Sequence, residues 1–151
     1  KVLSVGPRSE GEIFNLFANG FEFKNIVGID LFSYSPLIKL SDMHDMKVDN
    51  DQFDLVLMGW CLAYSNNKKK AIEEAKRVMK KNGMLIIGYT LTQRTDEDFM
   101  SERGYIIRSP HNKINSKKDL DVILNSCGLK EFYSKEINKG TSSRLLYGAT
   151  F

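Results

Sequence analysis

Short apolar runs recur through the first 90 residues of the chain. They are Lys1 to Val5, Asn25 to Leu31, Phe53 to Gly59 and Met84 to Thr90. Each is largely continuous and rich in Val, Ile or Leu, which is typical of strands buried on both faces of a sheet. Such strands occur in parallel sheets, whose crossovers are usually helical. The pattern therefore predicts an α/β protein.

Helical periodicity appears between and after these runs. Glu12 to Ala18 is amphipathic, and Asn67 to Lys81 carries one apolar stripe at the spacing of a helix. The dipeptide Asn82-Gly83 has the chemistry of a helix C-cap, so we expect the second helix to end there. Ser116 predicts the cap of a third helix that extends to about Cys127.

Two connections depart from strand–helix alternation. Phe32 to Pro36 is too short for a helix, so a very short strand over Leu37 to Leu40 would follow the second strand through a loop. At the other end of the chain, Lys130 to Ile137 and Ser143 to Phe151 flank the turn Asn138 to Ser142. This arrangement predicts an antiparallel hairpin.

The polar stretch Leu91 to Asn115 interrupts the pattern, and we expect a partly helical excursion on the substrate side of the sheet. The predicted fold class is α/β. It is a Rossmann-like, mostly parallel sheet with helices on both faces and a C-terminal antiparallel hairpin, in a single domain over residues 1–151. The chain begins at Lys1 directly on a strand and without an initiator Met, which raises the expectation that N-terminal elements are missing.

The residues that follow the strands are the candidates for a binding site, because open α/β sheets bind ligands beyond the carboxyl ends of their strands. They are Gly6 to Gly11, Asp30 to Leu31, Asp42 to His44 and Gly59 to Tyr64. The first set is a glycine turn before a helix, where free N–H groups and a partial positive charge favour anionic or polar ligands.

Two acids in these segments suggest nucleoside recognition. Asp30 ends the second strand and is placed to accept hydrogen bonds from the two hydroxyls of a ribose. Asp42 would face an adenine amino group, with a nearby backbone N–H reading a ring nitrogen. The alternatives remain open: Asp30 as a strand-terminating turn residue, and Asp42 as the first residue of an Asx-turn.

Residues Lys1 to Thr90 resemble the class I S-adenosylmethionine-dependent methyltransferases, particularly the type 11-like group that acts on small molecules. The resemblance rests on VLSVGPRSEGE, VGIDL, SDMHDMKVDNDQFDLVLMGW and AIEEAKRVMKKNGMLIIGYT. It implies S-adenosylmethionine as cofactor and a small molecule as methyl acceptor. The cofactor-binding residues that it implies are Gly6, Pro7, Arg8, Glu10, Gly11, Asp30, Leu31, Asp42, Met43, His44, Gly59 and Trp60.

The first motif of that family usually reads acid-x-Gly-x-Gly-x-Gly, and here Ser4, Gly6, Arg8 and Glu10 stand in those places. Arg8 and Glu10 would lie beside the methionine moiety and either reshape the pocket or fill it. A filled pocket would make the domain a non-catalytic binding or scaffold module of a larger biosynthetic protein. The third hypothesis is a nicotinamide-dependent reductase. It is disfavoured because this sequence has no second glycine-rich turn.

The methyl transfer would need alignment and, for some acceptors, a base. His111 and Tyr64 are the candidates for that base, and we interpret His44 as a solvent-exposed loop histidine. Cys61 has no charged partner nearby in the sequence, which disfavours a nucleophilic role. No cluster of His, Cys or acids has the spacing of metal ligands, so no metal is expected.

Composition and charge limit the classes of partner that the protein can have. The net charge of +3 is scattered, and the run Lys68 to Lys70 precedes Glu73 and Glu74, which is typical of a solvated helix start rather than a nucleic-acid interface. The region after the fourth strand also lacks the Asn/Asp-Pro-Pro-aromatic tetrapeptide of amino-directed methylases. No apolar run reaches the roughly 18 residues of a membrane helix. Two cysteines far apart in sequence fit a cytoplasmic protein, and the sequence does not indicate its oligomeric state.

Overall fold

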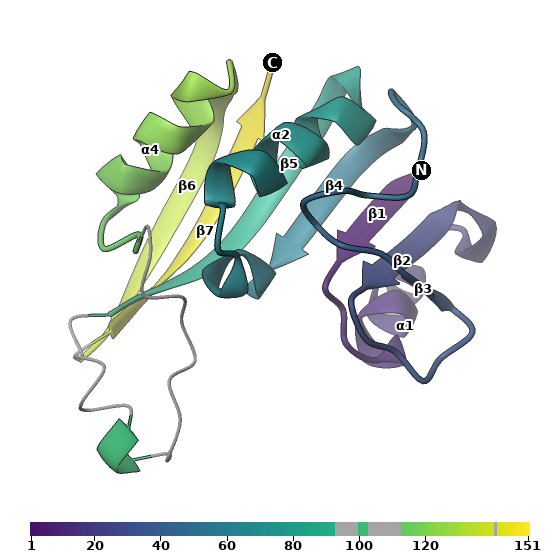
Figure 1. The fold of residues 1–151 in the computed structure, drawn as a ribbon, viewed down its shortest axis with the longest axis horizontal. Coiled ribbons are helices and arrows are strands. Elements are labelled where there is room, and N and C mark those ends of the chain that lie inside the picture. The colour runs from purple at the N-terminus through teal and green to yellow at the C-terminus, as the bar shows by residue number, and fades with distance from the viewer. Residues whose placement is uncertain (93–99, 103–112, 141) are drawn as a thin grey trace.

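A seven-stranded sheet organises the molecule (Figure 1). The structure, a computed structural model, describes residues 1–92, 100–102, 113–140 and 142–151. The strand order is β3-β2-β1-β4-β5-β7-β6. The strands are β1 (Val2–Val5), β2 (Ile26–Asp30), β3 (Ile38–Leu40), β4 (Phe53–Gly59), β5 (Met79–Thr92), β6 (Lys130–Lys139) and β7 (Ser142–Thr150). The first five are parallel, and β7 runs antiparallel between β5 and β6.

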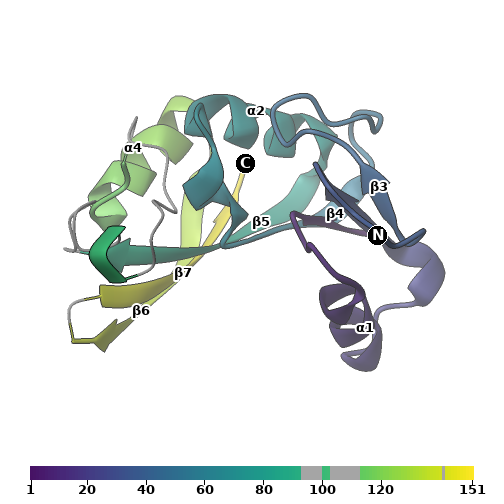
Figure 2. The ribbon, with the colours of Figure 1, turned by 60° about the horizontal axis from the view of Figure 1, so that its bottom comes forward.

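Helices lie on both faces of this sheet. In Figure 2, α1 (Glu10–Ala18) lies on one side, and α2 (Lys68–Val78) and α4 (Lys117–Ser126) lie on the other. There are also two short 3-10 helices, η1 (Phe23–Asn25) and η2 (Cys61–Tyr64). The predicted fold class is confirmed, including the C-terminal hairpin and the strand β3 that follows β2 without a helix. No helix in the described part of the chain is long and apolar enough to cross a membrane.

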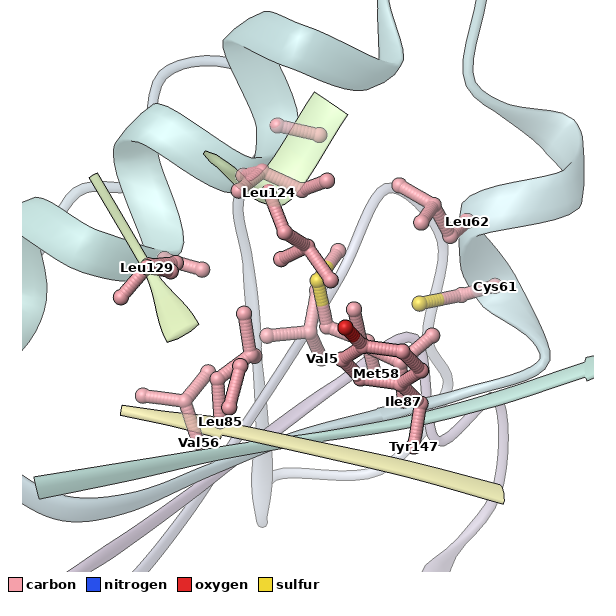
Figure 3. Close-up of a cluster of buried hydrophobic side chains, with 14 of the residues drawn as sticks. Val5, Val56, Met58, Cys61, Leu62, Leu85, Ile87, Leu124, Leu129 and Tyr147 are labelled. Atoms are coloured by element: carbon pink, nitrogen blue, oxygen red, sulfur yellow. The ribbon is translucent and has the colours of Figure 1, made fainter. Parts of the chain in front are cut away.

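The main core lies between the sheet and the helices α2 and α4 that cover one of its faces. Leu62 and Leu124 are fully buried above Met58 and Ile87 of the central strands (Figure 3). These side chains come from four separate segments, and each buried Leu, Ile or Met side chain contributes about 1.5–3 kcal/mol to folding. The core therefore fixes the relative positions of the strands whose carboxyl ends form the site described below.

The predicted boundary between the second helix and the next strand is wrong. The helix ends at Val78 instead of Lys81, and Met79 already belongs to β5, where it pairs with Phe53. Leu55 then pairs with Met84, so the residues between bulge out of the ladder. Gly83 serves this bulge rather than a helix cap, because a Cβ on it would lie 2.5 Å from the Met79 side chain.

The third predicted helix is confirmed at both ends. Ser116 is the N-cap of α4, with its hydroxyl accepting from the Asp119 backbone N–H at 3.3 Å. In return, the Asp119 carboxylate accepts from the Ser116 N–H at 2.9 Å, which completes a capping box. Beyond the helix, Gly128 has φ +72° and takes the left-handed conformation that commonly ends a helix.

Candidate active site

A pocket of about 440 Å³ opens at the carboxyl ends of β1, β2 and β4. This volume falls within the roughly 300–1,000 Å³ of small-molecule sites. Many of the residues predicted from the sequence line it, namely Gly6, Arg8, Asp30, Leu31, Met43, Gly59, Trp60 and Tyr64. The position agrees with the rule that open α/β sheets bind ligands where neighbouring crossovers diverge.

Asp30 is fixed at the edge of this pocket by the backbone. Its Oδ2 accepts from the Arg8 N–H at 2.9 Å, and its Oδ1 accepts from the Phe32 N–H at 3.2 Å. A carboxylate has about four lone-pair sites, so each oxygen can accept one further hydrogen bond. Asp30 is therefore oriented in advance and still able to bind a pair of hydroxyl donors.

The turn between β1 and α1 has an unusual backbone. Gly6 adopts φ +72°, and a Cβ there would lie 2.6 Å from the Cβ of Cys61, so only glycine fits. Arg8 also has a positive φ of 53°, a conformation that favours glycine over other residues. The loop thus keeps a glycine-like path at Arg8, where the family pattern has a glycine, and this path aims the Arg8 N–H at Asp30.

Three of the predicted cofactor-binding residues in this turn do not line the pocket. Glu10 accepts a hydrogen bond from the Ser35 hydroxyl at 2.6 Å, which ties the start of α1 to the β2–β3 connection. Pro7 is buried beside Gly28. Gly11 is exposed on the first turn of α1. Arg8 is at the pocket wall, but neither it nor Glu10 closes the cavity.

The segment after β3 forms a side-chain relay. Asp42 Oδ1 accepts from the His44 backbone N–H at 2.8 Å and contacts His44 Nδ1 at 2.7 Å, while His44 Nε2 lies 2.7 Å from Ser65 Oγ. The first of these bonds is an Asx-turn, and the backbone N–H is the main cause that lowers the pKa of Asp42. The interpretation of His44 as solvent-exposed is wrong, because its side chain is only 22% exposed and both ring nitrogens have partners.

The relay positions one pocket residue without entering the pocket itself. Met43 lies between Asp42 and His44 and lines the cavity, whereas neither of those neighbours does. Because Ser65 follows η2, the relay also connects the β3 side of the site to the segment after β4.

The segment after β4 supplies the opposite wall. Trp60 has φ +62° and packs against Gly88, where a Cβ would lie 3.0 Å from the indole ring. Trp60 is 47% exposed and Tyr64 is 61% exposed, so both are accessible from solvent. Burial raises the pKa of the Cys61 thiol to about 12, which leaves it protonated and a poor nucleophile at neutral pH. His111, the other candidate base, lies outside the described residues.

Glu12 is a polar residue at this site that the sequence reasoning missed. Its carboxylate accepts a hydrogen bond from the Ser4 hydroxyl at the end of β1. It also approaches Gly59 so closely that a Cβ there would lie 3.2 Å from Glu12 Oε2. The spacing Ser9-x-x-Glu12 predicts a capping box instead, yet Ser9 makes no side-chain cap hydrogen bond in the described part of the chain. Within that part, no three His, Cys, Asp or Glu side chains group as a metal site.

Similarities to other proteins extend over both the sequence and the fold. An uncharacterised protein of Methanocaldococcus jannaschii, MJ1123, is 34% identical over 82 residues, which cover 48% of this chain and 38% of that protein. The chain thus matches well under half the length of this curated relative. A crystal structure of a methyltransferase from Methanosarcina mazei, described as S-adenosylmethionine-dependent, has a TM-score of 0.73 at 16% identity, covering 98% of this chain and 90% of the other.

A second crystal structure is similar in fold only. It is the Burkholderia thailandensis 1,6-didemethyltoxoflavin-N1-methyltransferase, solved with 1,6-didemethyltoxoflavin and S-adenosylhomocysteine bound. Its TM-score is 0.68 at 10% identity, with 98% of this chain and 69% of the other covered. The family model described as a methyltransferase domain matches residues 3–87, which is more than half of the chain and contains the whole pocket. The chain therefore belongs to the methyltransferase domain family, as its resemblance to class I S-adenosylmethionine-dependent methyltransferases implied.

Proposed function

We propose that this domain transfers a methyl group from S-adenosylmethionine to a small molecule. The observation that carries the proposal is the pocket at the ends of β1, β2 and β4, with Asp30 held at its edge by the Arg8 N–H. The family membership and the ligands named for the Burkholderia enzyme support the same cofactor class and a small acceptor.

The nucleoside half of the cofactor fits the β2 side of the pocket. Asp30 has free acceptor capacity for two ribose hydroxyls. Leu31 and Phe32 are exposed and apolar at the pocket wall, and an adenine ring would cover them. Met43 lines the same pocket, while Asp42, which does not line it, uses Oδ1 to hold His44 and so positions the Met43 segment.

The reacting half would lie on the β4 side. S-adenosylmethionine supplies an electrophilic methyl group, which passes to a nucleophilic atom of the acceptor while the carbon–sulfur bond breaks and sulfur keeps the electron pair. The contribution of this chain is alignment, because holding the two reactants in line supplies much of the rate. Trp60 and Tyr64 are the exposed residues available to position an acceptor, and the Tyr64 hydroxyl is the described candidate for holding its proton.

We also propose a small-molecule acceptor and a cytoplasmic location. A small acceptor is supported by the resemblance to small-molecule enzymes and by the small-molecule ligand of the Burkholderia structure. Cys61 and Cys127 are both free and buried, which supports a cytoplasmic site of action.

Thermal unfolding with added cofactor tests the proposal. At a ligand concentration of about 100 times Kd, S-adenosylmethionine or S-adenosylhomocysteine would stabilise the protein by about 2.7 kcal/mol. For a chain of this length this raises Tm by roughly 5–10 °C. The substitution Asp30→Ala should remove the rise, because it deletes the acceptor for the ribose hydroxyls. Asp45→Ala is the matched control, since Asp45 is exposed and pairs with Lys47 outside the pocket.

The absence of any shift at millimolar cofactor would contradict the proposal. An equal shift for the wild type and for Asp30→Ala would contradict the assigned ribose contact. A shift without methyl transfer to any small acceptor would favour the non-catalytic module instead.

A further inference from the structure

The Glu12 carboxylate lies beside the pocket at the junction of three elements. Glu12 is on the first turn of α1, its hydrogen-bond donor Ser4 is on β1, and Gly59 ends β4. Gly59 lines the pocket, and the absence of a side chain there leaves room for Glu12 Oε2. Cys61 also lines the pocket, and the charge of Glu12 contributes to its raised pKa. The carboxylate therefore reaches pocket-lining residues from the α1 side.

In the part of the chain that the structure describes, this carboxylate pairs with no cation. Among residues 1–92, 100–102, 113–140 and 142–151, no Lys, Arg or His forms an ion pair with Glu12, and Ser4 is its hydrogen-bond donor. Two other carboxylates with little exposure do pair with a cation: Glu74 with Arg77 at 2.8 Å, and Asp121 with Lys117 at 3.0 Å. A cationic ligand group beside Glu12 would form the same kind of charge-assisted contact.

The start of α1 is a favourable place for the Glu12 carboxylate. Free N–H groups and the partial positive charge of a helix N-terminus favour a carboxylate in the first turn. The serine donor occupies Oε1, so Oε2 is open to a further donor. Glu12 also stands three residues after Ser9 and yet leaves the cap unmade, which shows that its side chain is directed to the strand ends instead.

We infer that Glu12 binds the ammonium group of the methionine moiety of the cofactor, an inference that rests on the function proposed above. Of the two cationic groups of S-adenosylmethionine, the ammonium offers three N–H donors, whereas the sulfonium offers none. An open carboxylate oxygen therefore selects the ammonium. A charge-assisted hydrogen bond of this kind is among the stronger ones in proteins.

The same position explains the altered first motif. Ser4 stands where the family pattern has an acid, and the Glu12 side chain brings a carboxylate back to Ser4 from the following helix. The negative charge at the end of β1 is thus retained, but it comes from a residue eight positions later.

Binding of two nucleosides to one variant tests this assignment. S-adenosylhomocysteine carries the ammonium, whereas 5′-methylthioadenosine shares the adenosine and the thioether but lacks the amino-acid part. Calorimetric titration of Glu12→Gln should show S-adenosylhomocysteine bound about 10- to 100-fold more weakly than by the wild type. The affinity for 5′-methylthioadenosine should stay within about 2-fold, because no contact to it is lost.

Two controls distinguish loss of the ammonium contact from a general effect of charge and from misfolding. Glu73→Gln makes the same charge change on an exposed part of α2 and should leave both affinities unchanged. Retained binding of 5′-methylthioadenosine shows that Glu12→Gln is folded around an intact nucleoside site.

Equal weakening of both ligands, or no weakening of either, would overturn the ammonium contact while leaving the cofactor proposal standing. An effect that appears only with an amine-bearing acceptor would also overturn it, by assigning Glu12 to the acceptor. A wild type that binds neither nucleoside would overturn both proposals together.

Discussion

Helices α1 and α4 begin with the same capping signature and make different use of it. Ser116 and Asp119 at the start of α4 exchange both hydrogen bonds of a capping box. Ser9 and Glu12 stand at the same spacing at the start of α1, but the Ser9 side chain makes no cap bond in the described part of the chain, and Glu12 bonds Ser4. One helix start is satisfied locally, and the other is left open beside the pocket.

The difference marks the site. The start of α4 serves only the fold, so every local preference agrees there. The start of α1 departs from three such preferences, namely the capping box, the left-handed backbone at Arg8 and, within the described residues, an acid without a cation. The Arg8 N–H reaches Asp30, and Glu12 lies against the pocket residue Gly59. Departures from local rules are expected where structure is arranged for binding.

The largest difference in stability should be between the variants that replace Ser116 and Ser9 by alanine. Ser116→Ala deletes a cap bond that forms and should destabilise the protein by about 1 kcal/mol, or about 2–4 °C in Tm. Ser9→Ala deletes a side chain that makes no cap bond and should cost no more than about 0.3 kcal/mol. Denaturant unfolding of both variants measures the pair, and equal losses would contradict the asymmetry.

The substitution Arg8→Gly should have a smaller effect on stability, and it should stabilise the protein. The positive φ of Arg8 costs about 1–2 kcal/mol in a residue with a Cβ. Glycine removes this cost, but it also makes the unfolded chain more flexible, so the net gain should be about 0.5 kcal/mol in the absence of cofactor. Arg8→Ala is the control, because it removes the side chain and retains the strain. If Arg8→Ala is stabilised as much as Arg8→Gly, the backbone is not the cause.

The smallest effect should be a pH dependence of the free energy of unfolding that comes from Asp119 at the start of α4. Hydrogen bonds from the backbone N–H groups of Asn115 and Ser116 hold the pKa of Asp119 below its usual value. A lowered folded-state pKa means that Asp119 stabilises the fold above its unfolded pKa of about 3.9 and loses this contribution as the pH falls through the folded value. Asp119→Asn should therefore be destabilising at neutral pH, and its effect should shrink as the pH falls below the unfolded pKa and through the lower folded pKa. Urea unfolding across this range would show it, and a loss that does not change with pH would contradict it.

Much of the fold could be predicted from local sequence. The buried runs predicted the strands, and Ser116 predicted the start of α4, because these signals act within a few residues. The boundary near Lys81 failed because the pairing of Met79 with Phe53 overrides the helical pattern, and no local signal reports a partner so far along the chain.

The candidate site also has features that the sequence predicted and features that it did not. The sequence by itself determined which candidate residues follow β1, β2, β3 and β4, and the parallel order of the strands brings most of them to one pocket. Only the tertiary structure decided which side chains point where: His44 turns to Ser65, Glu10 to Ser35, and Glu12 to Ser4. The physical reason is that strand order depends on patterns within each segment, whereas a hydrogen bond between segments depends on how those segments pack.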